Sequence, residues 1–151
     1  MADSGLQPTD TPWLRRAEEL AAAAAAAGNT PVGMVIVLHG DVIAEAAEEC
    51  PAGPRAFAHA ELLAVERALL EVRAPALKGA TLYSTAEPCL MCGFAIREAG
   101  IGRLVLGWPS GQIGSLLGEY PLLTDTLIKR WGPPPVVIRT GTANDRPSAG
   151  G

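Results

Sequence analysis

This chain of 151 residues has few cysteines, no long basic segment and no apolar run long enough to span a membrane. Only three cysteines occur, and two of them lie three residues apart, which argues against a disulfide scaffold. The net charge is −4, and no basic run exceeds the pairs Arg15-Arg16 and Lys129-Arg130. A small substrate is therefore favoured over a long nucleic acid, although a local basic patch remains open. Without the pattern of a secretory signal or a membrane span, we expect a cytoplasmic protein.

Apolar residues, by contrast, are abundant enough for one packed core. Hydrophobic residues make up 48% of the chain and charged residues 19%, a composition typical of a globular domain. The length fits one domain and leaves little room for a second. We expect a flexible N-terminus over residues 1–10, a single domain over residues 11–139 and a disordered tail over residues 140–151.

Apolar periodicity and turn residues divide this domain into alternating elements. A first helix has Thr11 as its expected N-cap, Pro12 at its first position and Gly28 after its end. The expected strands cover residues 34–38, 42–48, 80–85, 103–107 and 136–139, and the expected later helices cover residues 58–73, 88–99 and 122–130. A hairpin followed by strands that alternate with helices predicts an α/β fold, a three-layer α/β/α sandwich with a mixed sheet.

Two short motifs stand at the beginnings of two of these helices. The first is His59-Ala60-Glu61, and the second is Pro88-Cys89-Leu90-Met91-Cys92. Either motif alone is a weak signal, because a Cys-x-x-Cys pair also occurs in redox sites and in structural zinc sites. Together and in this order they match the H-x-E and P-C-x-x-C signature of zinc-dependent base deaminases. The match predicts one bound Zn²⁺ in this chain.

The chemistry of zinc agrees with this pairing of motifs. Catalytic zinc sites use three protein ligands and leave one position for water, and His59, Cys89 and Cys92 supply three. Two helix N-termini directed at the ion favour thiolates over thiols. Glu61 lies two residues beyond the histidine, close to the metal without binding it. We expect Glu61 to be the catalytic acid and base that moves protons between water, ring and ammonia.

Other interpretations of the same residues stay open at this point. A structural zinc site would need a fourth protein ligand, for which Cys50 and His39 are the candidates. Both are more simply explained as loop residues, since Cys50 lies in a Pro/Gly-rich segment and His39 at a hairpin turn. A zinc-stabilised binding module without catalysis would have four protein ligands and no need for Glu61.

From residue 29 to residue 107 the chain resembles the cytidine deaminase-like superfamily. It is most similar to the branch that contains tRNA adenosine deaminases, guanine deaminases and cytosine deaminases. The similarity lies in Pro31-Val32-Gly33, Ala58-His59-Ala60-Glu61, residues 80–83, residues 87–92 and Ile101-Gly102-Arg103. It implies a five-stranded mixed sheet flanked by helices, a homodimer, and a zinc-dependent deaminase domain with the ion at the paired helix starts.

The departures from this family bear on the substrate. An asparagine that commonly contacts the base or ribose is replaced here by Glu48 or Glu49. A carboxylate accepts hydrogen bonds but does not donate them as an amide does, which favours a ring edge rich in N–H donors, such as an amino-purine. These glutamates are equally well explained as solvated residues at a strand end. The basic C-terminal helix of RNA-editing relatives is also absent, which disfavours RNA as a partner.

The candidate substrate contacts are Glu48, Glu49, Phe57, Ala58 and Trp108. Phe57 and Trp108 flank the motifs and could stack on a ring, although packing explains such residues more often. The expected function is hydrolytic deamination of a free base or nucleoside, with guanine-like aminated rings ahead of cytosine. The first alternative is a tRNA adenosine-to-inosine deaminase, and the second is a non-catalytic zinc-stabilised binding module.

Overall fold

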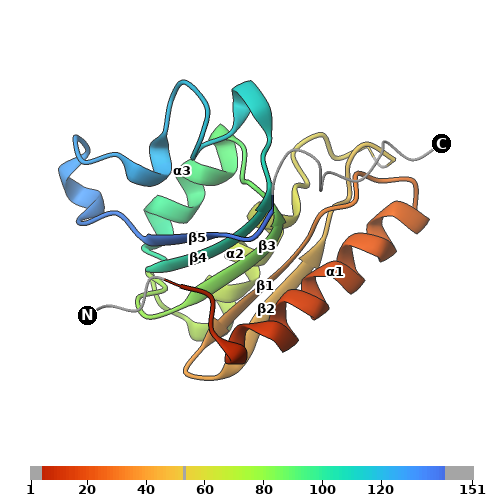
Figure 1. Cartoon of the computed structure of the whole chain (residues 1–151), viewed down its shortest axis with the longest axis horizontal. Helices are drawn as coiled ribbons and strands as arrows, with labels where there is room; N and C mark the ends of the chain where they lie inside the picture. The colour runs from red at the N-terminus through yellow and green to blue at the C-terminus, as the bar shows by residue number, and fades with distance from the viewer. Residues whose placement is uncertain (1–4, 53, 142–151) are drawn as a thin grey trace.

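The computed structural model describes residues 5–52 and 54–141 and forms three layers (Figure 1). One five-stranded mixed sheet lies between helices, with the strand order β2-β1-β3-β4-β5. β1 is antiparallel to β2 and β3, whereas β3, β4 and β5 run parallel. The strands are β1 (Gly33–Leu38), β2 (Asp41–Ala47), β3 (Thr81–Ala86), β4 (Arg103–Trp108) and β5 (Val136–Arg139). The predicted fold class is confirmed.

Within the residues that the structure describes, three α-helices cover the two faces of this sheet. α1 (Thr11–Ala26) packs on one face, and α2 (Ala60–Val72) and α3 (Leu90–Ala99) pack on the other (Figure 1). Alternation along β1 explains the division. Met34 and Ile36 belong to the core beneath α2 and α3, whereas Val35 and Val37 belong to the core beneath α1. A strand buried on both faces needs a continuous apolar run, which is what the sequence has at 34–38.

The expected helix over residues 122–130 is wrong. The segment instead contains two 3₁₀ turns, Leu122–Thr124 and Lys129–Trp131. Between them, the Asp125 carboxylate accepts hydrogen bonds at 3.0 Å from the backbone N–H groups of Leu127 and Ile128. An aspartate that bonds nearby backbone in this way competes with helix formation.

The ends of the domain also differ from expectation. Thr11 is the first residue of α1, and Asp10 is its N-cap. Asp10 is 2% exposed and is held by Arg103 and Tyr83, so the expected flexibility of residues 1–10 is wrong at this position. Thr140, expected in the disordered tail, donates its backbone N–H to Leu106 at 2.7 Å and extends the sheet pairing. The remaining expectations for residues 1–4 and 142–151 lie outside the described residues.

No helix in the described ranges is long and apolar enough to span a membrane.

Candidate metal centre and substrate pocket

The two motif residues His59 and Cys89 are the N-cap residues of α2 and α3. Both have extended backbone conformations, with φ −69° and ψ 143° at His59 and φ −70° and ψ 176° at Cys89. Each helix therefore begins later than the sequence pattern indicated, and each motif stands at the turn into its helix. Two helix N-termini meet here, and their partial positive charges favour anionic ligands such as thiolates.

The structure brings the three expected metal ligands together. His59 Nδ1 lies 3.5 Å from Cys89 Sγ and 3.5 Å from Cys92 Sγ. The three ligand atoms all lie within 4.8 Å of one another. Tetrahedral zinc with ordinary Zn–N and Zn–S bonds requires about 3.6 Å between a nitrogen and a sulfur ligand. The residues thus fit one zinc ion without rearrangement.

Close packing fixes the first turn of α3, which carries both cysteines. Gly93 lies directly after Cys92, and a Cβ atom there would lie 2.4 Å from the Cβ of Ser115. Ser115 in turn donates both its backbone N–H and its hydroxyl to the Pro88 carbonyl, at 2.9 and 2.7 Å. The loop after β4 is therefore pressed against the start of α3 and limits movement of the thiols.

The two cysteine thiols shift each other's pKa in opposite directions. The hydrogen bond with Cys92, together with smaller effects of the Cys92 backbone and His59, lowers the pKa of Cys89 to about 5 against the opposing effect of burial. The same contact, together with burial, raises the pKa of Cys92. One thiolate is therefore already favoured in the protein, and a divalent cation would favour the second.

Glu61 lies beside this group in the interior. It is 4% exposed, and the Ser84 hydroxyl is 3.5 Å from its Oε1 atom. Burial raises the pKa of Glu61, and the negative charge of Cys89 adds to the effect. A raised pKa brings a carboxyl group closer to the range in which it exchanges protons at neutral pH.

The structure separates the two adjacent glutamates at the end of β2. Glu48 is 7% exposed, and its Oε1 atom accepts a hydrogen bond from the Ala60 N–H at 2.9 Å. Burial, followed by the charge of Glu61, raises the pKa of Glu48 to about 8. Glu49 instead points outward and pairs with Arg55 at 3.1 Å. Of the two candidates, Glu48 alone joins the group around His59 and Glu61.

A pocket of about 210 Å³ lies over the metal group. Trp108 lines this pocket, but two other expected substrate contacts are placed elsewhere. Phe57 is 72% exposed, and Ala58 is buried with its carbonyl bonded to the Glu49 N–H. Sequence reasoning missed several lining residues, because they come from loops and strand ends far apart in the chain: Thr30, Val32, Cys50, Ala86, Glu87, Ser110 and Ile113.

The proposed fourth ligands of a structural zinc site do not join the metal group. Cys50 lines the pocket, but its thiol lies 3.0 Å from the Arg55 carbonyl, to which it donates. His39 stands at the β1–β2 turn with a φ of 51°, as expected for a hairpin turn. Neither residue belongs to the ligand group of His59, Cys89 and Cys92.

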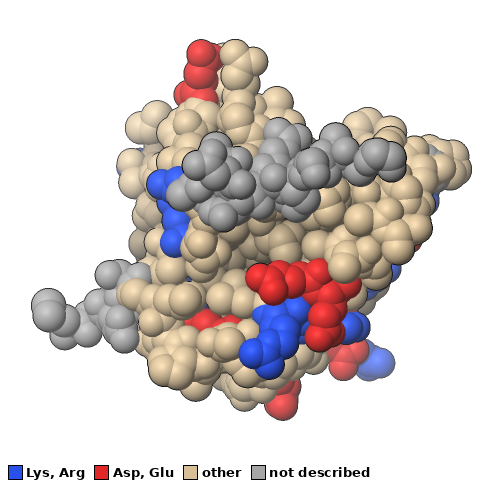
Figure 2. Space-filling view, turned by 45° about the vertical axis from the view of Figure 1, so that its right-hand side comes forward, with Lys and Arg blue, Asp and Glu red and all other residues tan. Residues whose placement is uncertain are grey.

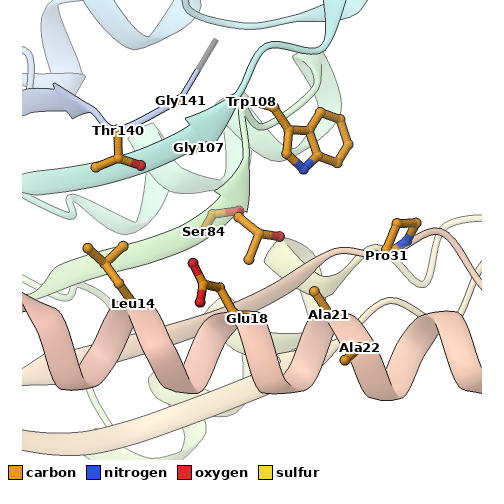
Figure 3. Close-up of a pocket in the computed structure, with 11 residues that line it drawn as sticks. Leu14, Glu18, Ala21, Ala22, Pro31, Ser84, Gly107, Trp108, Thr140 and Gly141 are labelled. Atoms are coloured by element: carbon orange, nitrogen blue, oxygen red, sulfur yellow. The ribbon is translucent and has the colours of Figure 1, made fainter. Parts of the chain in front are cut away.

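A larger cavity of about 480 Å³ lies between the sheet and α1, and Figure 3 shows Glu18 pointing from that helix towards the sheet. Its lining includes the small residues Ala21, Ala22 and Gly107. Trp108 lines both cavities. The larger cavity has no cysteine or histidine in its lining, so the metal-binding chemistry belongs to the smaller one.

Three soft or imidazole ligands beside a free, buried carboxylate are the composition of a catalytic zinc site rather than a closed structural one. Sequence comparison agrees with this class of site. The chain belongs to the family described as the cytidine and deoxycytidylate deaminase zinc-binding region, which matches residues 7–108. The predicted family and the predicted zinc cofactor are confirmed.

Proteins similar to this chain include deaminases named for adenosine in tRNA and for guanine. The tRNA-specific adenosine deaminase of Bacillus subtilis is 36% identical over 98 residues, which are 65% of this chain and 61% of that protein. The chain therefore spans less than two thirds of this relative. A structure from a study of A-to-I editing by tRNA:A34 deaminases has a TM-score of 0.77 and 30% identity, covering 86% of this chain and 98% of that one. Guanine deaminase from Bacillus subtilis has a TM-score of 0.62 and 34% identity, covering 66% and 64%.

Proposed function

We propose that this protein is a zinc-dependent hydrolytic deaminase that converts adenosine to inosine in tRNA. The observation that carries the proposal is the group of His59, Cys89 and Cys92 with the buried carboxylate of Glu61 beside it. The choice of adenosine in tRNA is supported by the curated relative and by the TM-score of the tRNA:A34 deaminase structure. It reverses the order of substrates expected from the sequence, which placed free aminated rings first.

In this proposal His59, Cys89 and Cys92 hold the ion. When bound, zinc would lower the pKa of a water molecule so that hydroxide, a strong nucleophile, is available at neutral pH. Glu61 takes the proton from that water, delivers it to the ring nitrogen next to the amine-bearing carbon, and assists protonation of the departing ammonia. The overall reaction consumes one water, breaks the exocyclic C–N bond and leaves an oxo group on the ring.

The size of the pocket bears on how RNA would be bound. A space of about 210 Å³ is large enough for one nucleobase but not for a stack of bases. The target nucleotide therefore has to leave its stack and enter the pocket alone. Figure 2 shows acidic and basic side chains intermixed on the described part of one face, without a broad basic area. We expect few phosphate contacts and hence a weak dependence of RNA affinity on salt.

The decisive experiment is incubation of the zinc-loaded protein with an anticodon stem-loop that has adenosine at the wobble position. Inosine is measured by mass spectrometry of the digested nucleosides. We expect inosine to accumulate with wild-type protein and not with Glu61→Gln. A stem-loop with guanosine at the same position is the matched control. Absence of inosine from a protein that contains one zinc per chain would reject adenosine in tRNA as the substrate.

A second candidate substrate is a free aminated base of the guanine type. The observation that favours it is Glu48, a carboxylate in the pocket whose Oε1 already accepts the Ala60 N–H. With its pKa raised to about 8, Glu48 carries a proton at neutral pH, so it would accept a hydrogen bond from a ring N–H group and donate one to a ring nitrogen or oxygen. Ammonia release from a panel of amino-purines, amino-pyrimidines, pterins and triazines tests this candidate. If the panel and the RNA are both inert, the non-catalytic binding module is the better description.

We also propose a homodimer. A groove of about 640 Å³ between α2 and α3 is lined largely by apolar side chains, among them Leu62, Leu69 and the 70% exposed Leu70. Burial of such a surface against a second copy would remove apolar area from water. Sedimentation equilibrium measures the assembly directly, and a monomer at micromolar concentration would contradict it.

A further inference from the structure

The buried acid Glu87 has no part in the proton transfers described above. It precedes Pro88 and is 3% exposed. Its Oε1 atom accepts the Ser110 N–H at 2.9 Å, and its Oε2 atom accepts the N–H groups of Leu116 and Leu117, both at 2.8 Å. Three backbone donors on one carboxylate are strong, charge-assisted hydrogen bonds, and they compensate its burial.

All three donors come from one loop, which winds around this carboxylate. The backbone of Glu87 takes part as well, since its carbonyl accepts the Ser110 hydroxyl at 2.6 Å and its N–H donates to Trp108 at 2.8 Å. Further along the loop, the backbone of Gly114 pairs with that of Cys89 in a single antiparallel β-bridge. The same loop supplies Ser110 and Ile113 to the lining of the substrate pocket.

Gly114 gives independent support for the importance of this contact. Its φ of −67° and ψ of 134° are ordinary for any residue, so the backbone does not require glycine there. A Cβ atom at this position, however, would lie 2.3 Å from Oε2 of Glu87. The absence of a side chain at residue 114 is thus explained by the space that the carboxylate occupies.

We propose that Glu87 is a positioning residue that holds residues 110–117 in place as one wall of the substrate pocket and so determines how well the substrate binds. The proposal rests on the proposed deaminase function for its kinetic consequence. Glu87 also lines the pocket, but its two carboxylate oxygens are occupied by three backbone N–H groups of the loop. It acts through Ser110 and Ile113, whose placement depends on the three bonds to its carboxylate.

The substitution Glu87→Gln tests this inference with almost no change of volume. An amide has one acceptor oxygen, and its NH₂ group would face at least one of the three backbone N–H groups. Because hydrogen bonds to charged groups are worth a factor of ten or more in an equilibrium, we expect KM to rise about tenfold. We expect kcat to stay within about twofold, since Glu61 and the ligands are unchanged. Zinc content, measured by atomic absorption, should remain at one per chain.

Hydrogen exchange followed by mass spectrometry reports on the loop without any substrate. In Glu87→Gln, exchange in peptides that contain residues 110–117 should be about tenfold faster, while peptides from α1 should be unchanged. Gly114→Ala should produce the same change, because its Cβ displaces the carboxylate. The double substitution should be no worse than either single one, since both remove the same contact. Glu119→Gln, an exposed acid on the same loop, is the matched control and should alter neither exchange nor KM.

Unchanged exchange in residues 110–117 would overturn the inference, and so would faster exchange with an unchanged KM. A loss of thermal stability with an equal loss of kcat and no change in KM would identify a general structural role instead. If wild-type protein deaminates neither RNA nor bases, the proposed function fails. The anchoring of the loop would still be decided by exchange.

Discussion

The two faces of the sheet both bury carboxylates, but they treat them in opposite ways. Beneath α1, Asp10 bonds Arg103 twice at 2.8 Å and Tyr83 at 2.6 Å, and its pKa is lowered chiefly by the Arg103 guanidinium. Beneath α2 and α3, the pKa values of Glu48 and Glu61 are raised by burial. Within the described ranges, neither of these two acids forms an ion pair with lysine or arginine.

This contrast separates stability from chemistry. A buried acid that is paired with a cation remains ionised over the physiological range, and removal of either partner alone destabilises the fold. A buried acid without a cationic partner is costly to ionise, and such acids occur where protons are exchanged. Substitution of the paired Asp10 or Arg103 should therefore reduce stability more than turnover, and substitution of Glu61 should reduce turnover more than stability.

The largest expected effect is on the face that carries the metal group. Glu61→Gln removes the proton carrier and should reduce turnover by about 10³-fold or more, in the range ascribed to general acid–base catalysis. Zinc content should remain at one per chain, because Glu61 is not among the ligands. The comparison is made by single-turnover kinetics and metal analysis on the same preparation. Turnover within tenfold of wild type would remove Glu61 from the mechanism.

The next effect concerns the α1 face and should appear in stability alone. Arg103→Met leaves the buried Asp10 carboxylate without its main partner and should lower the free energy of unfolding by about 3 kcal/mol. Urea denaturation measures this change. We expect kcat and KM at 25 °C to be unchanged within about twofold. A large loss of kcat in a folded Arg103→Met protein would break the division between the two faces.

The pH dependence of stability sharpens the same comparison. The pKa of Asp10 is lower in the folded protein than its ordinary value of 3.8. Its contribution is therefore complete at neutral pH and is lost as the pH falls below about 4 towards the folded value. Denaturant unfolding from pH 7 to pH 3 should show a smaller decline in Asp10→Asn than in wild type. Equal declines would mean that Asp10 is not a main source of acid sensitivity.

The smallest effect is expected at the cavity of about 480 Å³ between the sheet and α1. Glu18 is an exposed residue of α1 whose side chain points towards the sheet and lines that cavity (Figure 3). Glu18→Ala should change the free energy of unfolding by no more than about 0.5 kcal/mol, as for most surface substitutions. Deamination rates should be equal to those of wild type. A clear loss of activity would show that the α1 cavity takes part in function.

The sequence is informative where the determinants are local. The strand at 34–38 and the helix starts at His59 and Cys89 follow from short apolar runs and motif spacing, and the structure places all of them close to their expected positions. The metal group could be predicted because both motifs lie at helix N-termini. The expected helix over 122–130 failed because the Asp125 carboxylate bonds local backbone there.

Interactions between distant residues could not be predicted in the same way. Asp10 and Arg103 are 93 residues apart, and no sequence pattern around Asp10 indicates that it pairs with an arginine. Which of Glu48 and Glu49 faces the pocket depends on the direction of each side chain at the end of β2, which the sequence does not show. The role of Glu87 depends on a loop that lies 23 to 30 residues further along the chain.

X-ray absorption at the zinc edge of the wild-type protein tests the central claim most directly. The account predicts two sulfur ligands at about 2.3 Å and two nitrogen or oxygen ligands at about 2.0–2.1 Å, from His59, Cys89, Cys92 and one water. A third sulfur, which only Cys50 could supply, would contradict it, because the position needed for water would then be filled by protein.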